Sequence, residues 1–349
     1  MADHCMVEGT NEPEKKTLPR LDIKTGINHS PHVVILGAGA SRACCPLGDK
    51  NGRHLPLMAD FAATVGVEEI IKEAGYDPAG NFEHIYSQLH STGKEDAIKK
   101  LDSAVRAYFG GLALPDEPTF YDYLVLSLRS KDSIITFNWD PLIIQAYKRW
   151  RHLGRVLPDL VFLHGNVGLG LDLKNKTFTF LSDNPQQTPT KLLYPVENKD
   201  YNSDEFVADQ WARAVDALSQ AYYVTIIGYS APKTDVEAKS LLLAAWRDNS
   251  TRTLAQFSII DIRDAQEVEA SWADFLHGVH GGASSDPLKQ YLMMHPRRTC
   301  EAFAFATLQQ QPWKEDRYFE VKSINDLEAW IKPLIDEEVT GKLSGKPHH

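Results

Sequence analysis

The sequence predicts an α/β fold, in which a Rossmann-like parallel sheet is flanked by helices and interrupted by a helical insertion. Short apolar, β-branched runs, each closed by glycine or a polar residue, are typical of buried parallel strands. Stretches with apolar residues at every third or fourth position lie between several of these runs and indicate helices. A chain of 349 residues is long enough for one large domain with an inserted subdomain, or for two modest domains.

We expect the folded domain to span residues 31–338. Residues 1–30 are polar and weakly periodic, and residues 339–349 have a similar composition, so both segments are predicted to be flexible. Within the domain, a helical insertion is expected at about 56–130. An insertion of a hairpin and long loops is expected at about 166–202.

The first half of the domain begins with a predicted strand at His32–Leu36, a glycine-rich turn and a helix. Helical periodicity then occupies four stretches of the insertion: Met58–Val65, Phe82–Leu89, Ala97–Phe109 and Phe120–Leu128. Two more strands follow at Ser133–Phe137 and Leu160–Leu163.

The second half begins with alternating residues at Lys176–Phe180, which predict the hairpin. The remaining elements are a helix at Ser203–Gln220, a strand at Tyr223–Ile227, a helix from Thr234 to about Asp248 with Thr234 and Glu237 as its capping pair, the last core strand at Phe257–Asp261, and a helical segment at Ile324–Ile335.

The composition is that of a soluble globular protein, with 43% hydrophobic and 24% charged residues. A net charge of −10 disfavours a protein that coats nucleic acid, because phosphate contacts require clustered Lys and Arg. The short basic runs Lys99-Lys100 and Arg297-Arg298 are interpreted as solvated surface. We therefore expect no direct binding of nucleic acid.

The four cysteines are too sparse for a disulfide framework and lack the spacing of a zinc site: Cys5, Cys44, Cys45 and Cys300. Neither a signal peptide nor a run of about 18 apolar residues is found. We expect a cytoplasmic protein with reduced thiols and no contact with membranes.

Four short polar or glycine-containing motifs close the predicted strands. They are Gly37–Ser41 (GAGAS), Thr136–Asp140 (TFNWD), Leu163–Gly165 (LHG) and Gly228–Ser230 (GYS). Ligands of open α/β sheets bind where the carboxyl ends of the strands meet. The motifs are therefore expected to share one site.

The glycine turn after the first strand allows backbone N–H groups to approach a pyrophosphate at a helix N-terminus. It does not fit the dehydrogenase fingerprint, because Arg42 occupies the third glycine position and no acidic residue closes a following strand about 20 residues on. A tight turn that binds no ligand is the alternative.

The polar residues of the next two motifs are candidates for catalysis. Asn138 and Asp140 lie two residues apart, so an extended backbone points both side chains the same way; turn formation is their alternative role. His164 can act as a general base near neutral pH, or as a structural hydrogen-bonding group.

In this order, the motifs resemble the sirtuin superfamily, whose members read GAGxS, TxNxD, HG and G(T/S)S, and the resemblance covers residues 32–262. GYS followed by Asp235, together with Glu83 in NFEHI, looks more like the bacterial sirtuin-like NAD-cleaving proteins of antiphage defence than like protein deacylases. Classical deacylases carry a four-cysteine zinc ribbon after the histidine. Residues 166–220 contain no cysteine, so we expect no zinc ribbon and no metal.

The resemblance implies that NAD is the substrate and that the nicotinamide–ribose bond is cleaved. Asn138 would then position the attacking water or a ribose hydroxyl, Asp140 would hold the nicotinamide carboxamide, and His164 would accept a proton. Trp139 replaces a small aliphatic residue of the family; core packing is its favoured role, and obstruction of a peptide substrate is the alternative.

The resemblance also implies a set of NAD-binding residues. Gly37, Ala38, Gly39 and Ser41 would contact phosphates, with Arg42 as a charge partner, and Gly228 and Ser230 would line the other phosphate or the adenine ribose. Asp261 would contact adenosine or cap the turn that follows it.

The leading hypothesis is an NAD hydrolase that depletes NAD in antiphage defence. The alternatives are a protein deacylase or ADP-ribosyltransferase that uses the same site, and a non-catalytic NAD-binding assembly subunit. By family analogy, we expect a homo-oligomer or a complex with a separately encoded partner such as a HerA-like ATPase. The sequence leaves open the activating trigger, the linear or cyclic form of the ADP-ribose product, and the role of the helical insertion.

Overall fold

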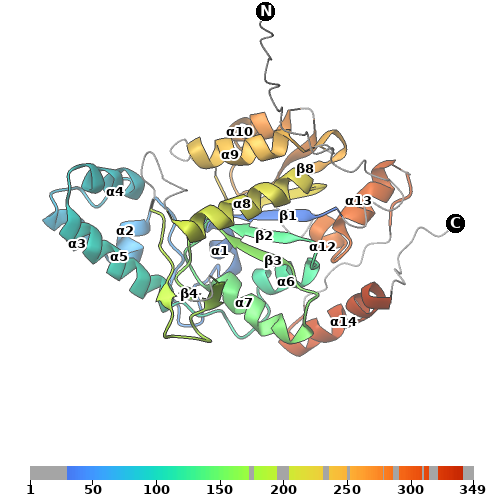
Figure 1. The fold of residues 1–349 in the computed structure, drawn as a ribbon, viewed down its shortest axis with the longest axis horizontal. Helices are drawn as coiled ribbons and strands as arrows, with labels where there is room; N and C mark the ends of the chain where they lie inside the picture. Colours follow the sequence, from blue (N-terminus) through green and yellow to red (C-terminus); the bar gives the residue numbers. More distant parts are fainter. Residues whose placement is uncertain are drawn as a thin grey trace, which may run out of the picture.

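The computed structural model describes residues 30–172, 177–194, 204–230, 236–249, 252–277, 279–285, 291–308, 310–313 and 321–340 (Figure 1). The predicted helix cap at Thr234 and the motif residue Asp235 lie outside these residues, as do 1–29 and 341–349. Among the described helices, none has the length and apolar character needed to cross a membrane.

Six parallel strands form the central sheet, in the order β3-β2-β1-β7-β8-β9. Their bounds are β1 His32–Leu36, β2 Ser133–Thr136, β3 Asp159–Phe162, β7 Tyr223–Ile227, β8 Gln256–Ile260 and β9 His280–Ser284. Counting these strands alone, the order is 3-2-1-4-5-6, which is the doubly wound order of dinucleotide-binding folds. The predicted Rossmann-like fold is confirmed, and the strand order reverses between β1 and β7.

Both faces of the sheet are buried, which explains the continuous apolar runs of its strands. Val33 and Ile35 of β1 belong to one core, and Val34 and Leu36 belong to the other. Figure 1 shows helices α8, α9 and α10 on the side of the first core and α1, α6 and α7 on the other side. The bounds of these helices and their short neighbours are α1 Ala38–Cys44, α7 Leu142–Trp150, η1 Arg151–Leu153, α8 Glu205–Gln220, α9 Val236–Arg247, η2 Arg252–Leu254, α10 Ala265–Ser271 and α11 Ala273–Leu276.

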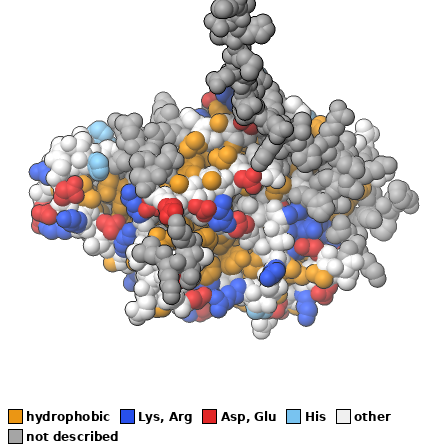
Figure 2. Space-filling view, in the orientation of Figure 1, with side chains coloured by type: hydrophobic (Ala, Val, Ile, Leu, Met, Phe, Trp, Pro, Cys, Tyr) orange, Lys and Arg blue, Asp and Glu red, His pale blue; other side chains and the backbone are white. Residues whose placement is uncertain are grey.

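The spacing of apolar residues in helix α8 determines which face of the helix packs on the sheet. Its buried residues follow helical spacing: Val207, Gln210, Trp211, Ala214 and Leu218. Charged side chains of both signs lie along its outer face (Figure 2). The helix is therefore held on the sheet by one buried stripe, in which Gln210 also accepts a hydrogen bond from the N–H of Phe162 on β3.

The helical insertion between β1 and β2 contains α2 Phe61–Val65, α3 Glu68–Glu73, α4 Phe82–Ser91, α5 Glu95–Gly110 and α6 Phe120–Ser127. The four predicted helices are confirmed, and α3 is an additional one. In Figure 1, α2 to α5 lie together at one end of the molecule, whereas α6 lies against the sheet.

After β3, the chain forms a small antiparallel sheet in the order β5-β4-β6. Its strands are β4 Leu169–Asp172, β5 Thr177–Phe180 and β6 Thr188–Pro189. The alternation at Thr177–Phe180 correctly predicted a hairpin strand, which pairs with β4.

Two expectations about the later part of the chain are wrong. Phe257–Ile260 is not in the last core strand, because β9 pairs beyond it. The interpretation of Arg297 and Arg298 as solvated surface is also wrong, since each is only 2% exposed. Lys99 and Lys100 are exposed as expected.

The C-terminal helices are α12 Tyr291–Met294, α13 Thr299–Leu308 and α14 Ile324–Thr340. Helix α14 includes Val339 and Thr340, which the sequence assigned to a flexible tail. At the other end, Ser30 is buried and its carbonyl accepts a hydrogen bond from Lys131. The folded part is therefore slightly longer than predicted at both ends.

Candidate functional site

The carboxyl ends of β1 and β7 meet at the point where the strand order reverses. The N–H groups of Gly37 and Gly39 donate to the carbonyls of Ile227 and Gly228, each at 3.0 Å. A Cβ on Gly37 would lie 2.5 Å from the Cα of Tyr229. The two glycine-containing turns therefore touch backbone to backbone, and close packing alone requires glycine there. Two N–H groups of the predicted phosphate-binding turn are occupied within the protein.

Asn138 follows β2, and both N–H bonds of its side-chain amide donate hydrogen bonds within the protein. Its Nδ2 donates to the carbonyl of Gly37 and to Ser41 Oγ, both at 2.9 Å. Its backbone N–H donates to Thr136 Oγ1. Because a carbonyl only accepts, the contact with Gly37 assigns the nitrogen to this side. The Oδ1 atom is left as the acceptor for a ligand or a water.

Ser41 joins Asn138 to Asp140. The Ser41 hydroxyl donates to Asp140 Oδ2 at 2.6 Å, so the side chains of Asn138 and Asp140 converge as their spacing predicted. The other carboxylate oxygen of Asp140 accepts from the N–H of Leu142, which is the turn-forming role that the sequence left open. Burial raises the pKa of Asp140, while the hydrogen bonds from Ser41 and Leu142 oppose that rise.

His164 lies one strand further along the sheet, after β3. Its ring packs edge-on against Phe137, with centroids 4.9 Å apart, and is 8% exposed. Phe137 stacks in turn on Tyr229 of the GYS motif, at 4.3 Å. The four motifs therefore meet around Gly37 and Phe137, and the ring of His164 joins them through its contact with Phe137.

Two buried residues of this site were missed at the sequence level. Asn166 donates through Nδ2 to the carbonyls of Asn138 and Asp140, at 3.1 and 2.6 Å, and is 0% exposed. It follows the LHG motif directly, and this position was the available signal. Tyr121 lies 2.7 Å from Ser41 Oγ through its hydroxyl, and its place in an apolar helical pattern gave no such signal.

The other predicted binding residues lie around this centre with partners of their own. Arg42 forms an exposed ion pair with Asp60 at 2.9 Å. Asp261 accepts hydrogen bonds from the N–H and guanidinium of Arg263, so it caps the following turn. Burial raises the pKa of Asp261, but the hydrogen bonds from Arg263 outweigh this and hold it below its usual range. Ser230 is exposed, and Ala38 begins helix α1.

Trp139 packs into the core, as favoured from the sequence. It is 7% exposed and contacts the rings of Phe61, Phe109 and Tyr194. The segment between Asn138 and Asp140 is therefore anchored on the helical insertion.

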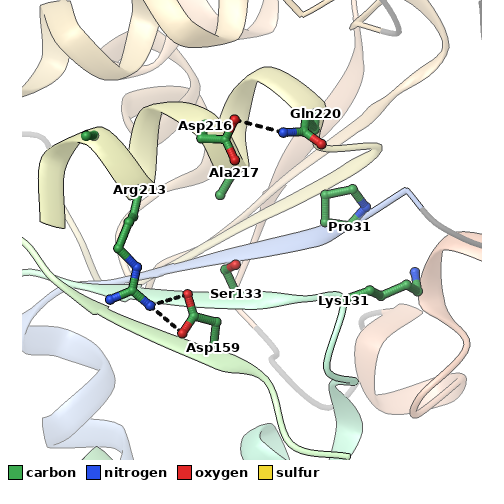
Figure 3. Close-up of a pocket in the computed structure, with 9 residues that line it drawn as sticks. Pro31, Lys131, Ser133, Asp159, Arg213, Asp216, Ala217 and Gln220 are labelled. Atoms are coloured by element: carbon green, nitrogen blue, oxygen red, sulfur yellow. Dashed lines mark hydrogen bonds and ion pairs between the residues drawn. The ribbon is translucent and has the colours of Figure 1, made fainter. Parts of the chain in front are cut away.

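A hollow of about 430 Å³ lies at the opposite, amino edge of the sheet (Figure 3). Ser133 and Asp159, which begin β2 and β3, line it together with α8. Figure 3 shows Arg213 reaching Asp159, and Asp216 bound to Gln220. Because these polar groups pair with one another, the carboxyl edge is the stronger candidate for the functional site. Among the described residues, no group of three or more His, Cys, Asp or Glu side chains could hold a metal ion.

No family model and no curated protein matches the sequence. Among solved structures, the chain is similar to Sir2 proteins. A Sir2 homolog in complex with NAD shares 13% identity, with a TM-score of 0.36 over 82% of this chain and 93% of that chain. Sir2 bound to an acetylated peptide shares 12% identity, with a TM-score of 0.34 over 71% of this chain and 93% of that chain.

Proposed function

We propose that the protein is an NAD⁺ hydrolase that cleaves the nicotinamide–ribose bond to give nicotinamide and ADP-ribose. The orientation of Asn138 supports this most directly. Its nitrogen is held by Gly37 and Ser41, so its oxygen is the acceptor that can orient a water or a ribose hydroxyl. The position of this group, at the reversal of a doubly wound sheet, is where such folds bind dinucleotides.

The proposed chemistry passes through an oxocarbenium-like state at the ribose. The nicotinamide ring is cationic in NAD⁺ and leaves as a neutral molecule, so no strong general acid is required. Water, oriented by Asn138, forms the new bond to the ribose carbon and gives up a proton to His164. Asp140, Ser41 and the glycine turns would hold the nicotinamide and phosphate ends, and this positioning lowers the barrier.

The absence of cysteine from residues 166–220 favours hydrolysis over deacylation, because the deacylases resembled by the motifs build their peptide channel against a zinc ribbon. We extend the proposal to an NAD-depleting role in bacterial antiphage defence. In that role the protein acts as a homo-oligomer or with a HerA-like ATPase partner. Mass measurement of the protein alone and with the products of neighbouring genes tests the assembly, and a monomer under both conditions would contradict it.

The activity is tested by incubating the purified protein with NAD and separating nicotinamide and ADP-ribose by chromatography. We expect Asn138→Ala and His164→Ala each to lower turnover by at least about 100-fold, since positioning and proton transfer each contribute at this scale. The exposed residues Asn51 and His90 provide matched controls, and Asn51→Ala and His90→Ala should cleave NAD like the wild type.

Three results would redirect the assignment. Unchanged turnover in both site variants would refute the proposed roles. NAD consumption that requires an acylated or acceptor peptide would indicate a deacylase or an ADP-ribosyltransferase. NAD binding in calorimetry without cleavage, with and without the partner, would indicate a non-catalytic subunit.

A further inference from the structure

We propose that Tyr121, on helix α6, is a positioning residue that fixes Ser41 and, through it, Asn138 and Asp140. This inference rests on the proposed function. The Tyr121 hydroxyl lies 2.7 Å from Ser41 Oγ and 3.4 Å from Asn138 Nδ2, and the residue is 1% exposed. A side chain of the helical insertion therefore reaches the centre of the site.

Hydrogen-bond accounting defines what Tyr121 does. A serine hydroxyl has one proton and two lone pairs. With Asp140 ionised, Ser41 gives its proton to Asp140 Oδ2 and accepts from Asn138 Nδ2. The Tyr121 hydroxyl must then donate to the remaining lone pair. All three positions of Ser41 are filled, and its hydroxyl has a single orientation.

Helix α6 is itself held rigidly, so Tyr121 has little freedom. Thr119 and Asp122 form a capping box at the start of this helix. The buried carboxylate of Asp122 also accepts from Trp150 Nε1 at 2.8 Å and from Arg149 at 2.9 Å. Both partners belong to the end of α7, the helix that begins two residues after Asp140. Asp122 thus ties the helix of Tyr121 to the helix that follows Asp140.

The charges around Tyr121 determine in which direction its hydroxyl shifts the pKa of Asp140. Burial and the nearby carboxylate of Asp140 raise the pKa of Tyr121, and Cys44 is the other titratable group that acts on it. Tyr121 therefore stays protonated at neutral pH as a donor. Its hydrogen bond to Ser41 strengthens the one from Ser41 to the Asp140 carboxylate. Without it, the ionised form of Asp140 is less stabilised and should titrate at a higher pH.

The first test compares Tyr121→Phe with Tyr147→Phe, a control at a partly buried tyrosine on α7 that packs on Phe180. Tyr121→Phe keeps the aromatic ring and removes only the hydroxyl. We expect it to lower kcat for NAD cleavage by about tenfold, as for loss of a hydrogen bond that acts on a charged group, and to leave KM within about twofold. The acid limb of the kcat profile should move to higher pH. Unchanged kcat and pH profile would overturn the proposal, and Tyr147→Phe should match the wild type.

The second test does not depend on NAD cleavage. The carboxyl carbon of Asp140 is titrated by ¹³C NMR in the free protein, with Asp140→Asn identifying its signal. Tyr121→Phe should raise this pKa, and it should add no further shift in a Ser41→Ala background, because the effect passes through Ser41. An unshifted pKa, or equal shifts in the two backgrounds, would overturn the positioning role. Should Tyr121→Phe not fold, 3-fluorotyrosine at position 121 provides a stronger donor and should lower the same pKa.

An inactive wild type with the expected titration shift would refute the proposed hydrolase while leaving the Tyr121 network supported. An active wild type without the titration shift would support the proposed hydrolase and refute the positioning role of Tyr121. The two proposals can therefore fail separately.

Discussion

At the scale of single residues, His32 is a buried imidazole at the amino end of the central strand. It is 1% exposed, its Nε2 lies 2.8 Å from Thr225 Oγ1, and its ring packs on Tyr223. Among the described atoms, its Nδ1 has no hydrogen-bond partner. Burial lowers the pKa of His32 to about 3, with Asp132 opposing the shift and Lys131 adding to it. His32 is therefore neutral in the folded protein.

This histidine makes the fold sensitive to mild acid. Between pH 6.5, where an unfolded histidine titrates, and about pH 3, the unfolded chain takes up a proton that the folded one does not. The free energy of unfolding should therefore be highest above pH 6.5 and fall as the pH drops, by up to about 1.4 kcal/mol per pH unit. Urea unfolding at pH 7, 6 and 5 measures this loss.

His32→Gln keeps a hydrogen-bonding group beside Thr225 but cannot titrate, so its stability should depend less on pH. His90→Gln, at an exposed position, should behave like the wild type. The comparison also cancels the contribution of Asp140, whose raised pKa acts with the opposite sign. Equal pH dependence in the wild type and His32→Gln would contradict the prediction.

The site could be predicted from the sequence only where it lies at strand ends. Asn138, Asp140 and Ser41 follow recognisable strands, and the topology of the sheet brings such ends together. Tyr121 could not be found this way, because helical periodicity says that an aromatic residue is buried but not which group its hydroxyl meets. The partner in question, Ser41, is 80 residues away.

At the scale of elements, the contact between the two glycine turns leaves no room for a side chain at Gly228. Gly228 has a φ of 61°, and a Cβ there would lie 2.3 Å from the backbone N of Ala40. Both the conformation and the space exclude a side chain.

We expect Gly228→Ala to lower the free energy of unfolding by about 2–4 kcal/mol, combining left-handed strain with displacement of a backbone. NAD cleavage should fall with it, since Gly37 and Asn138 would shift. Gly66→Ala separates the two causes, because Gly66 has a φ of 77° with open space around its Cβ position. It should cost only about 1 kcal/mol. Equal losses in urea unfolding would show that crowding contributes nothing.

Most strands could be predicted because both sheet faces are buried, which leaves an unbroken apolar run such as Val33–Leu36. Strand β9, His280–Ser284, could not, because it contains no β-branched or large apolar residue and lies at the sheet edge. Helix α7, Leu142–Trp150, was not among the predicted helices, because a proline directly before it favours a turn as readily as a helix start. Pro141 is in fact the residue before the first helical position.

At the scale of the whole molecule, Arg297 fastens the C-terminal helices to the rest of the fold. Its guanidinium donates to the carbonyls of Leu126, Leu128 and Val156, and it forms an ion pair with Glu338 at 2.7 Å. These partners come from the end of α6, the segment before β3 and helix α14. From the sequence, Arg297-Arg298 is assigned to the solvated surface, because the partners that bury Arg297 are remote along the chain.

Arg297→Met should lower the free energy of unfolding by about 3–5 kcal/mol, because three carbonyls lose their donor and Glu338 keeps only its ion pair with Arg129. Arg42→Met breaks the exposed pair with Asp60 and should cost less than about 1 kcal/mol. Chemical denaturation of both variants measures the difference, and similar losses would mean that the buried guanidinium adds no net stability.

The central position of β1 also affects when the protein can form. Val34 pairs with Ile134 on one side and with Thr225 on the other, and both partners lie far along the chain. Contacts between such remote residues close slowly, because the ordering of a long loop precedes the gain from pairing. During synthesis on the ribosome, β1 therefore cannot pair along both of its edges until β7 has emerged. We expect an unfinished chain to lack the proposed NAD site until synthesis has passed Ile227.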